Sequence, residues 1–469
     1  MTSSRTKLRA HRAVIGGLAL AAVTLAPLAQ SWAQSGGRAP TLLRDTEIEE
    51  ILHRQADPIL AAAGLNPKDV RILLVGDSSL NAFATQGQQM GLNTGLILEA
   101  ANPNELNGVI AHETGHIAGG HPIRSGELTR AGLKPMLLTM GLGLLAIMAG
   151  APDAGALVLA SSGQMGTLGA LGYSREQEGR ADQAAIGFLE KTGQSSRGLV
   201  EFFDRFRYQE VFTEARRYPY FRSHPLSSQR IELLRSRVLV QPHYASVDSP
   251  ESIAEFEIMK AKIDGFMNPA ASLVKYKETD TGFPARYARS IAYFQSKDPD
   301  RALKVLDGLL AEHPDNPYLW ELKGQILFEY GRIPEAEAPQ RRSVELKPDA
   351  TLLRVNLGQT LINLDDAQKR DEGIAELKRV TVLEPDNPEA WRLLAVAYDR
   401  RGDEGLARLA TAEQYYAYGA LGESRAFAIR ARQLLDRKST DWVRATDIVM
   451  ASDPTDQDIR ALSRESDGS

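Results

Sequence analysis

The chain has 469 residues, of which 25% are charged, with a formal net charge of −5 and no cysteine. One domain usually takes roughly 100 to 200 residues, so this length predicts at least two. The weakly acidic balance excludes the basic surface that nucleic-acid binding requires, and the absence of cysteine excludes disulfides and a lipid-modified N-terminal cysteine.

The first 33 residues have the parts of a secretory signal peptide. Basic residues up to Arg12 precede an apolar run that ends near Ala26, and small residues surround a cleavage position at Ala33. The apolar run is shorter than the ~20 residues of a membrane span, which favours cleavage over a membrane anchor. We therefore expect an exported, periplasmic protein.

A small α+β region follows the signal peptide. Residues 42–65 have helical periodicity, and "VRILLVGD" at 70–77 is typical of a buried strand. The segment 80–100 predicts two short strands around a glycine turn, followed by a helix. Such a hairpin is either an ordinary buried one or a strand that pairs with an extended substrate. From there to about residue 241 the sequence is mainly helical.

The segment "GVIAHETGHIAGGHP" carries the strongest chemical signal. Asn102, Pro103 and Glu105 form a helix start with a capping acid. His112 and His116 are four residues apart and therefore share one face of this helix, so both imidazoles can reach one zinc ion. Glu113 beside them has the place of the general base that takes a proton from the attacking water. The alternative is two ordinary histidines on a helix.

Catalytic zinc usually has three protein ligands, so a third is needed. His121 is one residue out of register with the form H-E-x-x-H-x-x-G-x-x-H, which would need histidine where Pro122 stands. A later helix, opening at Ser174 and ending at Gly193, places Glu178 and Asp182 on one face. We expect Glu178 to bind zinc and Asp182 to hold a ligand imidazole by its ring N–H.

Residues 135–173 form two apolar stretches that Pro152 separates, with Asp153 the one charged residue between Lys134 and Arg175. They predict either a pair of buried helices or a surface that contacts a membrane or an apolar substrate.

His224 stands directly before Pro225, which biases it toward an extended conformation. We expect it to be a movable zinc ligand that closes the site at rest, and to stabilise the oxyanion once it withdraws. Arg230, one turn into a helix capped by Ser227 or Ser228, is the reserve candidate for the oxyanion. The alternative is a His-Pro turn held by an ordinary hydrogen bond.

Residues 283–435 repeat. Pro314, Pro348 and Pro385 are 34 and then 37 residues apart, and a 34-residue period is typical of tetratricopeptide repeats. Three extra residues near 363–373 are expected to lengthen a turn. Such a solenoid is a concave surface for a partner unless it is purely structural.

Together, "HETGH" and "YSREQEGRAD" resemble the H-E-x-x-H and E-x-x-A-D motifs of the zinc peptidases that include the HtpX heat-shock protease and the CAAX prenyl protease. The resemblance implies that His112, His116 and Glu178 are zinc ligands, with Glu113 as base and Asp182 behind a ligand. It also matches His121 to a histidine of the family without giving it a metal role.

With the signal peptide and the repeats, the resemblance implies a periplasmic zinc metalloendopeptidase. The resemblance further implies that it degrades misfolded or stalled outer-membrane proteins and assists their assembly, with its repeats docking onto the assembly machinery. The alternative is mainly a chaperone or scaffold with proteolysis in reserve. We predict a mainly α protein with these parts: a signal peptide at 1–33, a metallopeptidase domain at 34–240, a helical linker at 241–282, a repeat domain at 283–435 and a polar tail at 436–469.

Overall fold

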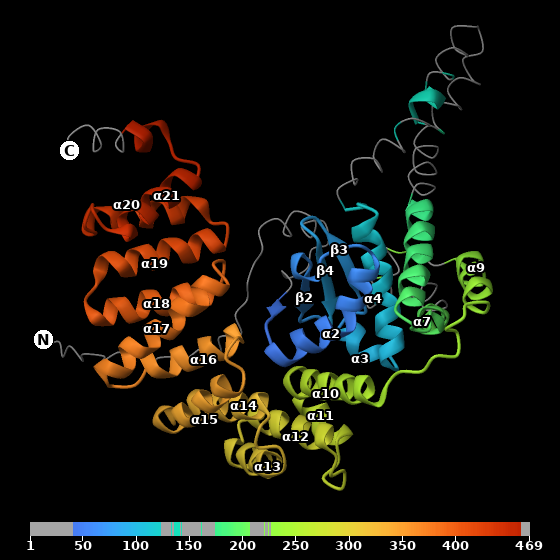
Figure 1. Ribbon diagram of the computed structural model, residues 1–469, viewed down its shortest axis with the longest axis horizontal. Coiled ribbons are helices and arrows are strands. Elements are labelled where there is room, and N and C mark those ends of the chain that lie inside the picture. Colours follow the sequence, from blue (N-terminus) through green and yellow to red (C-terminus); the bar gives the residue numbers. More distant parts are fainter. Residues whose placement is uncertain are drawn as a thin grey trace, which may run out of the picture.

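The computed structural model describes residues 41–122, 133, 136–140, 142, 161, 174–206, 220, 224 and 227–460. The expected signal peptide and nearly all of the apolar stretch at 135–173 lie outside this part. Within it the protein is mainly α, as predicted, with one small sheet near the N-terminus (Figure 1). No helix among the described residues has the length and apolar character to cross a bilayer.

The sheet has four strands in the order β1-β2-β4-β3. Its strands are β1 (Leu42–Leu43), β2 (Arg71–Val75), β3 (Ala82–Thr85) and β4 (Gln89–Asn93). β2 and β4 are parallel, whereas β3 pairs antiparallel with β4, so that Ala82 faces Leu92 and Thr85 faces Gln89. The hairpin of β3 and β4 turns at Gly87, and α3 (Thr94–Glu99) follows, which confirms the predicted pattern. β3 is an edge strand and contacts α4.

The prediction that helical structure begins at residue 42 was wrong. Leu42 and Leu43 form β1, paired with Val75 and Leu74, and α2 (Thr46–Ala62) starts after Asp45. The Asp45 side chain accepts a hydrogen bond from the Ile48 N–H, which is the usual way in which an aspartate ends the extended chain and caps a helix.

The HETGH segment lies on α4 (Pro103–Ala118), and two helices pack closely against it: α7 (Arg197–Phe206) and the helix over residues 174–191. The start of α4 is as predicted, since the Asn102 side chain accepts from the Glu105 N–H and the Glu105 carboxylate accepts from the Ala101 N–H. A Cβ on Gly115 would lie 2.8 Å from the Ala181 carbonyl oxygen, and one on Gly108 would lie 2.8 Å from Leu199. Glycine therefore lets the helices approach at both sites.

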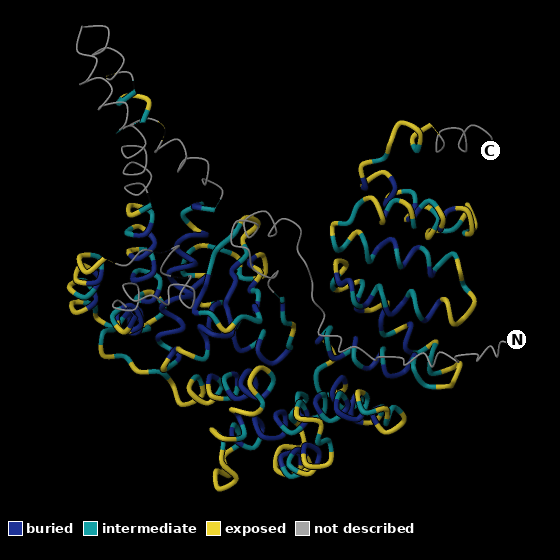
Figure 2. The backbone as a smooth tube through the Cα atoms, turned by 180° about the vertical axis from the view of Figure 1, so that it is seen from behind, coloured by how far each residue is buried: buried dark blue, intermediate teal, exposed yellow. Residues whose placement is uncertain are grey.

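The second half of the described chain is a helical array that curves up beside the first half (Figures 1 and 2). Buried residues recur along its helix pairs, as they do within the first half of the chain (Figure 2). α9 (Ser228–Val238) still belongs to the first half, where it packs on α7. The helices that follow are α10 (Pro250–Met267), α11 (Pro269–Lys275), α12 (Phe283–Gln295), α13 (Pro299–Glu312), α14 (Pro317–Glu329), α15 (Ile333–Leu346), α16 (Thr351–Ile362), α17 (Ala367–Leu383), α18 (Pro388–Arg401), α19 (Glu404–Ala417), α20 (Leu421–Leu434) and α21 (Thr440–Ala451).

Two expectations for the array need correction. The extra residues near 363–373 mainly lengthen a helix rather than a turn, because α17 has 17 residues where α15 has 14. The segment from 436 onward is not simply a loose polar tail, because α21 lies within it and packs on α20. Its Ala445, Ile448 and Val449 are buried and have the spacing of an apolar helix face.

The array also contacts the first half of the chain through α2. The Lys262 ammonium of α10 is buried and lies 2.8 Å from Asp45 and 3.1 Å from Glu47. The Tyr287 hydroxyl of α12 donates to Glu47. Ile258 packs against both the first core and the first cluster of the array. The two halves are thus joined by a shared apolar contact and a buried ion pair.

Candidate metal centre

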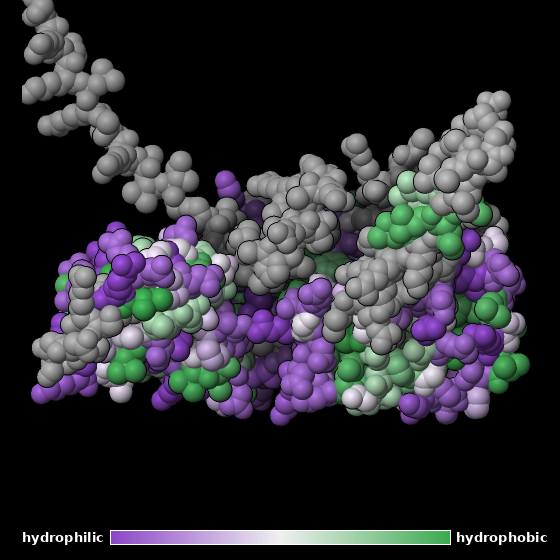
Figure 3. Space-filling view, turned by 90° about the horizontal axis from the view of Figure 1, so that it is seen from above, coloured by the Kyte–Doolittle hydropathy of each residue, from purple (hydrophilic) through white to green (hydrophobic). Residues whose placement is uncertain are grey.

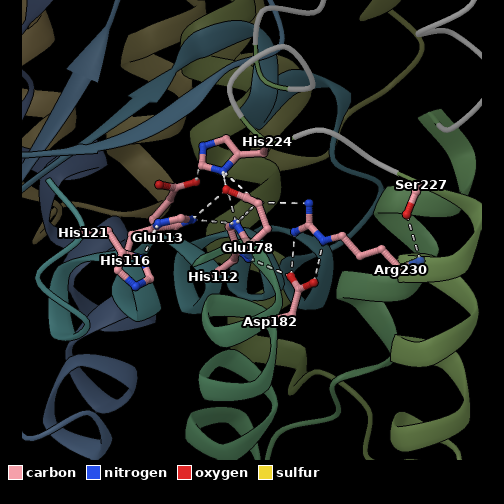
Figure 4. Close-up of polar contacts among 9 residues, drawn as sticks. All are labelled: His112, Glu113, His116, His121, Glu178, Asp182, His224, Ser227 and Arg230. Atoms are coloured by element: carbon pink, nitrogen blue, oxygen red, sulfur yellow. Dashed lines mark hydrogen bonds and ion pairs between the residues drawn. The ribbon is translucent and has the colours of Figure 1, made fainter. Parts of the chain in front are cut away.

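Four ionisable side chains converge in the core of the first half, between α4 and the helix over residues 174–191 (Figure 4). His112 and His116 come from α4, Glu178 from the second helix, and His224 from the chain before α9. One ligand atom from each lies within 4.8 Å of all the others, and all four side chains are buried. The structure therefore brings together the three expected zinc ligands and His224.

The distances place the ring nitrogens around one carboxylate. Nε2 of His112 lies 3.3 Å from Oε2 of Glu178, and Nε2 of His116 lies 3.4 Å from Oε1. Nδ1 of His224 lies 3.0 Å from Oε1 of Glu178 and 3.3 Å from Nε2 of His112. The nitrogens thus point toward a common centre, as the spacing of four residues on one helix face predicts.

Asp182 and Arg230 hold this arrangement from behind. Oδ1 of Asp182 lies 2.9 Å from Nδ1 of His112, the nitrogen that faces away from the cluster. Arg230 donates from Nε and Nη2 to the two oxygens of Asp182, at 2.6 and 2.7 Å. Its Nη1 lies 3.0 Å from Glu178, and its guanidinium lies over the Phe203 ring. Ser227 caps α9 by accepting from the Arg230 N–H, as predicted (Figure 4).

Glu113 follows His112 on α4, and its carboxylate accepts no hydrogen bond from the ligand side chains. Both of its carboxylate oxygens are buried, and within the described part of the chain neither has a hydrogen-bond partner. The nearest ionic contact is Nε2 of His224, at 3.5 Å from Oε1. Such a buried carboxylate is costly unless something absent from the protein chain, such as a polarised water, satisfies it.

Two contacts of this site had no clear signal in the sequence. Nδ1 of His121 lies 2.9 Å from Nδ1 of His116, so His121 stands behind a ligand, as Asp182 does, and outside the group of four. Tyr220 stacks on His224, with ring centroids 4.7 Å apart. Only the proximity of His121 to the motif could have indicated the first contact.

Burial and charge act in opposite directions on these groups. Burial alone would raise the pKa of Asp182, but the hydrogen-bonded Arg230 outweighs it and holds that pKa below its usual value. Burial would lower the pKa of His112, but Asp182 and Glu178 raise it to about 9. Burial, together with the neighbouring His112, lowers the pKa of His116. The cluster therefore favours positive charge at its centre, which a proton or a divalent cation can supply.

The donor set fits a metal of the zinc type. Imidazole nitrogens and one carboxylate are ligands that zinc accepts, and the outer nitrogens of His112 and His116 each face a further side chain. The unpartnered oxygens of Glu113 add a group that can take a proton beside the ligands. An arrangement of this kind is suited to hydrolysis.

Comparison with known proteins agrees with this geometry. Residues 42–238 match the model of peptidase family M48, and residues 287–351 and 362–423 match a tetratricopeptide repeat model. The chain is 24% identical over 399 residues to the beta-barrel assembly-enhancing protease of Escherichia coli, covering 83% of this chain and 80% of that protein. The protein of that name from Yersinia pestis is 24% identical over 387 residues, covering 82% and 79%.

Another relative matches a smaller share of the chain. The metalloprotease LoiP of Escherichia coli is 30% identical over 177 residues, which are 37% of this chain and 63% of that protein.

Proposed function

We propose that this chain, a metalloprotease that matches peptidase family M48 over residues 42–238 and carries tetratricopeptide repeats, is a periplasmic zinc endopeptidase that degrades misfolded or stalled outer-membrane proteins and assists their assembly. The observation that carries the proposal is the buried group of His112, His116, Glu178 and His224 beside the unpartnered Glu113. The name of its relatives, beta-barrel assembly-enhancing protease, supports the substrate class.

His112, His116 and Glu178 would hold the zinc ion, and Asp182 would orient His112 through its ring N–H. When bound, zinc acts as a Lewis acid that lowers the pKa of water to about 7. Glu113 takes the proton from the attacking water and passes it to the leaving amine. Arg230 pairs with Asp182 and contacts Glu178, which supports a role in positioning these two carboxylates. Its second candidate role is to stabilise the oxyanion if His224 does not.

We assign His224 two roles in turn. In the resting protein it would be the fourth residue to hold the metal, because its Nδ1 lies 3.0 Å from Glu178 and 3.3 Å from His112. When it withdraws, its imidazole stabilises the oxyanion of the tetrahedral intermediate. The variant His224→Ala separates the roles by turnover of a loosely folded substrate: turnover rises if closure dominates and falls if the oxyanion role does. Unchanged turnover with an unchanged spectrum of the cobalt-substituted protein would contradict both.

The outer edge of β3 is our proposed binding site for an extended substrate. β3 is an edge strand and lies against α4, which carries Glu113. A peptide that adds to such an edge forms main-chain hydrogen bonds whatever its sequence, which suits an enzyme that acts on many unfolded chains.

The division of the chain belongs to the same proposal. A signal peptide at 1–33 directs export, and the domain at 34–240 cleaves the substrate. A helical linker at 241–282 joins this domain to the repeats at 283–435, which bind the outer-membrane assembly machinery. The repeats support a protein partner, since stacked helix pairs present an extended surface.

The test is the variant Glu113→Gln, which retains the size of the side chain but cannot accept the proton. We expect cleavage of an unfolded outer-membrane protein to fall by about 10²- to 10⁴-fold, the usual effect of losing a general base, with zinc content unchanged. Cleavage at the wild-type rate would exclude Glu113 as the base.

The same variant addresses the alternative, a chaperone or scaffold. If it corrected the assembly defects of a deletion strain as well as the wild type does, the non-catalytic role would dominate. Outer-membrane proteins trapped by the inactive variant would identify the substrates.

A further inference from the structure

Tyr220 connects His224 to the edge strand. The backbone N–H of His224 donates to the backbone carbonyl of Tyr220 at 2.8 Å. The two rings stack with an angle of 30° between their planes. The Tyr220 N–H in turn donates to the carbonyl of Leu80 at 3.2 Å, two residues before β3. Tyr220 is fully buried and packs on Phe202 and Phe203, so His224 and Tyr220 form one unit.

The carbonyl of Leu80 belongs to the outer edge of the sheet. The Asn93 N–H donates to the Asn81 carbonyl, so the backbone groups of Asn81 point toward β4. Backbone groups of successive residues in an antiparallel ladder point to opposite sides. Those of Leu80, Ala82 and Ala84 therefore face outward, where a substrate strand would pair.

This edge is covered at one end. Leu80 and Ala82 are 1% and 0% exposed, whereas Ala84 is half-buried. A strand that pairs along β3 as far as Leu80 must displace what covers it. At Leu80 the group to be displaced is the amide of Tyr220.

We propose that Tyr220 is a positioning residue through which substrate on β3 controls His224. While its amide occupies the Leu80 carbonyl, the stacked Tyr220 ring holds His224 among the ligand atoms. A substrate strand that reaches Leu80 takes over this acceptor, and Tyr220 withdraws together with His224. The inference rests on the proposed binding of substrate to β3 and on the proposed roles of His224.

Hydrogen exchange tests the displacement directly. The full-length mature protein with Glu113→Gln and zinc bound is mixed with an unfolded peptide long enough to pair from Ala84 to Leu80. Exchange of the Tyr220 amide should become faster, while the β4 amides stay protected. A shorter form of the peptide, truncated at the end that lies against Leu80, should bind without this effect. Exchange that is unchanged or slower with the long peptide overturns the proposal.

A second measurement uses the variant Tyr220→Leu in cobalt-substituted protein. Loss of the stacking should change the visible spectrum toward that of His224→Ala, and Tyr220→Phe should retain the wild-type spectrum. The preference of the enzyme for the long over the short peptide in kcat/KM should fall by about two- to tenfold, the effect of one lost aromatic contact.

The matched control is Phe202→Leu, which removes a buried ring that packs on Tyr220 but not on His224. A spectrum and a peptide preference that change as much in this variant as in Tyr220→Leu would show a general packing effect and overturn the proposal. Failure of the proposed function would look different, because cleavage would then persist in the variant Glu113→Gln.

Discussion

Two glutamates of the same helix show how burial decides the role of a residue. Glu176 is exposed and pairs with Arg180, one turn away on the same helix. Glu178 is 4% exposed and touches His112, His116, His224 and Arg230. The three histidines, His224 first among them, overcome the effect of burial and hold the pKa of Glu178 below its usual value. This direction favours the ionised carboxylate, the form that a metal ligand must have.

Replacing Glu178 with Gln should remove the metal. A neutral amide is a weaker ligand, so we expect the affinity for zinc to fall by more than the roughly 10- to 100-fold that loss of an outer partner costs. The measurement is zinc content after dialysis against a chelator. The matched control is Glu176→Gln, which should retain the wild-type content of about one zinc per chain. Loss of zinc from the control alone would mean that Glu176 is the ligand.

The ligand residues could be predicted from the sequence because they follow helix geometry. His112 and His116 repeat at four residues, as do Glu178 and Asp182, so each pair shares a face whatever the fold around it. The contact of Tyr220 with Leu80 could not be predicted in this way. It joins positions that are 140 residues apart through backbone groups, which every residue has, and so it leaves no pattern in the side chains.

At the level of helices, the site depends on how closely α4 approaches the helix over residues 174–191. Gly115 lies between His112 and His116 on the chain and faces the backbone of Ala181, next to Asp182. The ligands of the two helices can meet only at this short separation. The sequence predicted both helices, but nothing in the pattern of glycines showed which one marks their contact.

The variant Gly115→Ala should therefore push the two helices apart. Its Cβ would meet the Ala181 carbonyl oxygen at 2.8 Å, and a backbone atom cannot move aside as a side chain does. We expect the free energy of unfolding of the zinc-loaded protein to fall by about 1–3 kcal/mol, as in other overpacked cores. Urea denaturation measures this change, and the zinc content should fall with it.

The control for this variant is Gly187→Ala on the helix over residues 174–191. A Cβ there meets nothing within 4 Å. Helix propensity then acts alone and should raise the stability by roughly 0.5–1 kcal/mol. If both variants gained stability, the inference that Gly115 is needed for the close approach of the two helices would be wrong.

On the scale of the whole molecule, the array and the catalytic part meet at several places, and two of these contacts differ in character. The first is the buried contact of Lys262 with Asp45 and Glu47. The second consists of two solvent-exposed ion pairs, Arg71 with Asp386 at 2.5 Å and Arg44 with Glu384 at 3.4 Å. Viewed from above, hydrophilic side chains lie along the boundary between the two parts (Figure 3).

The repeat pattern predicted the array but not this docking. A 34-residue period specifies how each helix pair packs on the next, since the apolar positions recur within the unit. The ion pairs of the second contact join residues 315 and 340 positions apart and lie outside the repeated positions. A single exposed pair of this kind contributes only about 0–1 kcal/mol, so the second contact is weak compared with the buried one.

We therefore expect salt and charge reversal to open the second contact while the first one holds. The variant Arg71→Glu places two acids opposite each other, and a loss of up to about 1 kcal/mol should raise the population of the open array several-fold. Small-angle scattering should then give a larger radius of gyration than for the wild type, and 1 M salt should give the wild type a similar increase.

Adding Asp386→Arg to Arg71→Glu restores the ion pair and should restore the wild-type radius of gyration. The variant Arg342→Glu is the control, because it breaks an exposed pair with Asp315 inside the array and should leave the radius unchanged. If the charge swap failed to restore what the single reversal changed, Arg71 would act on the array by another route than Asp386.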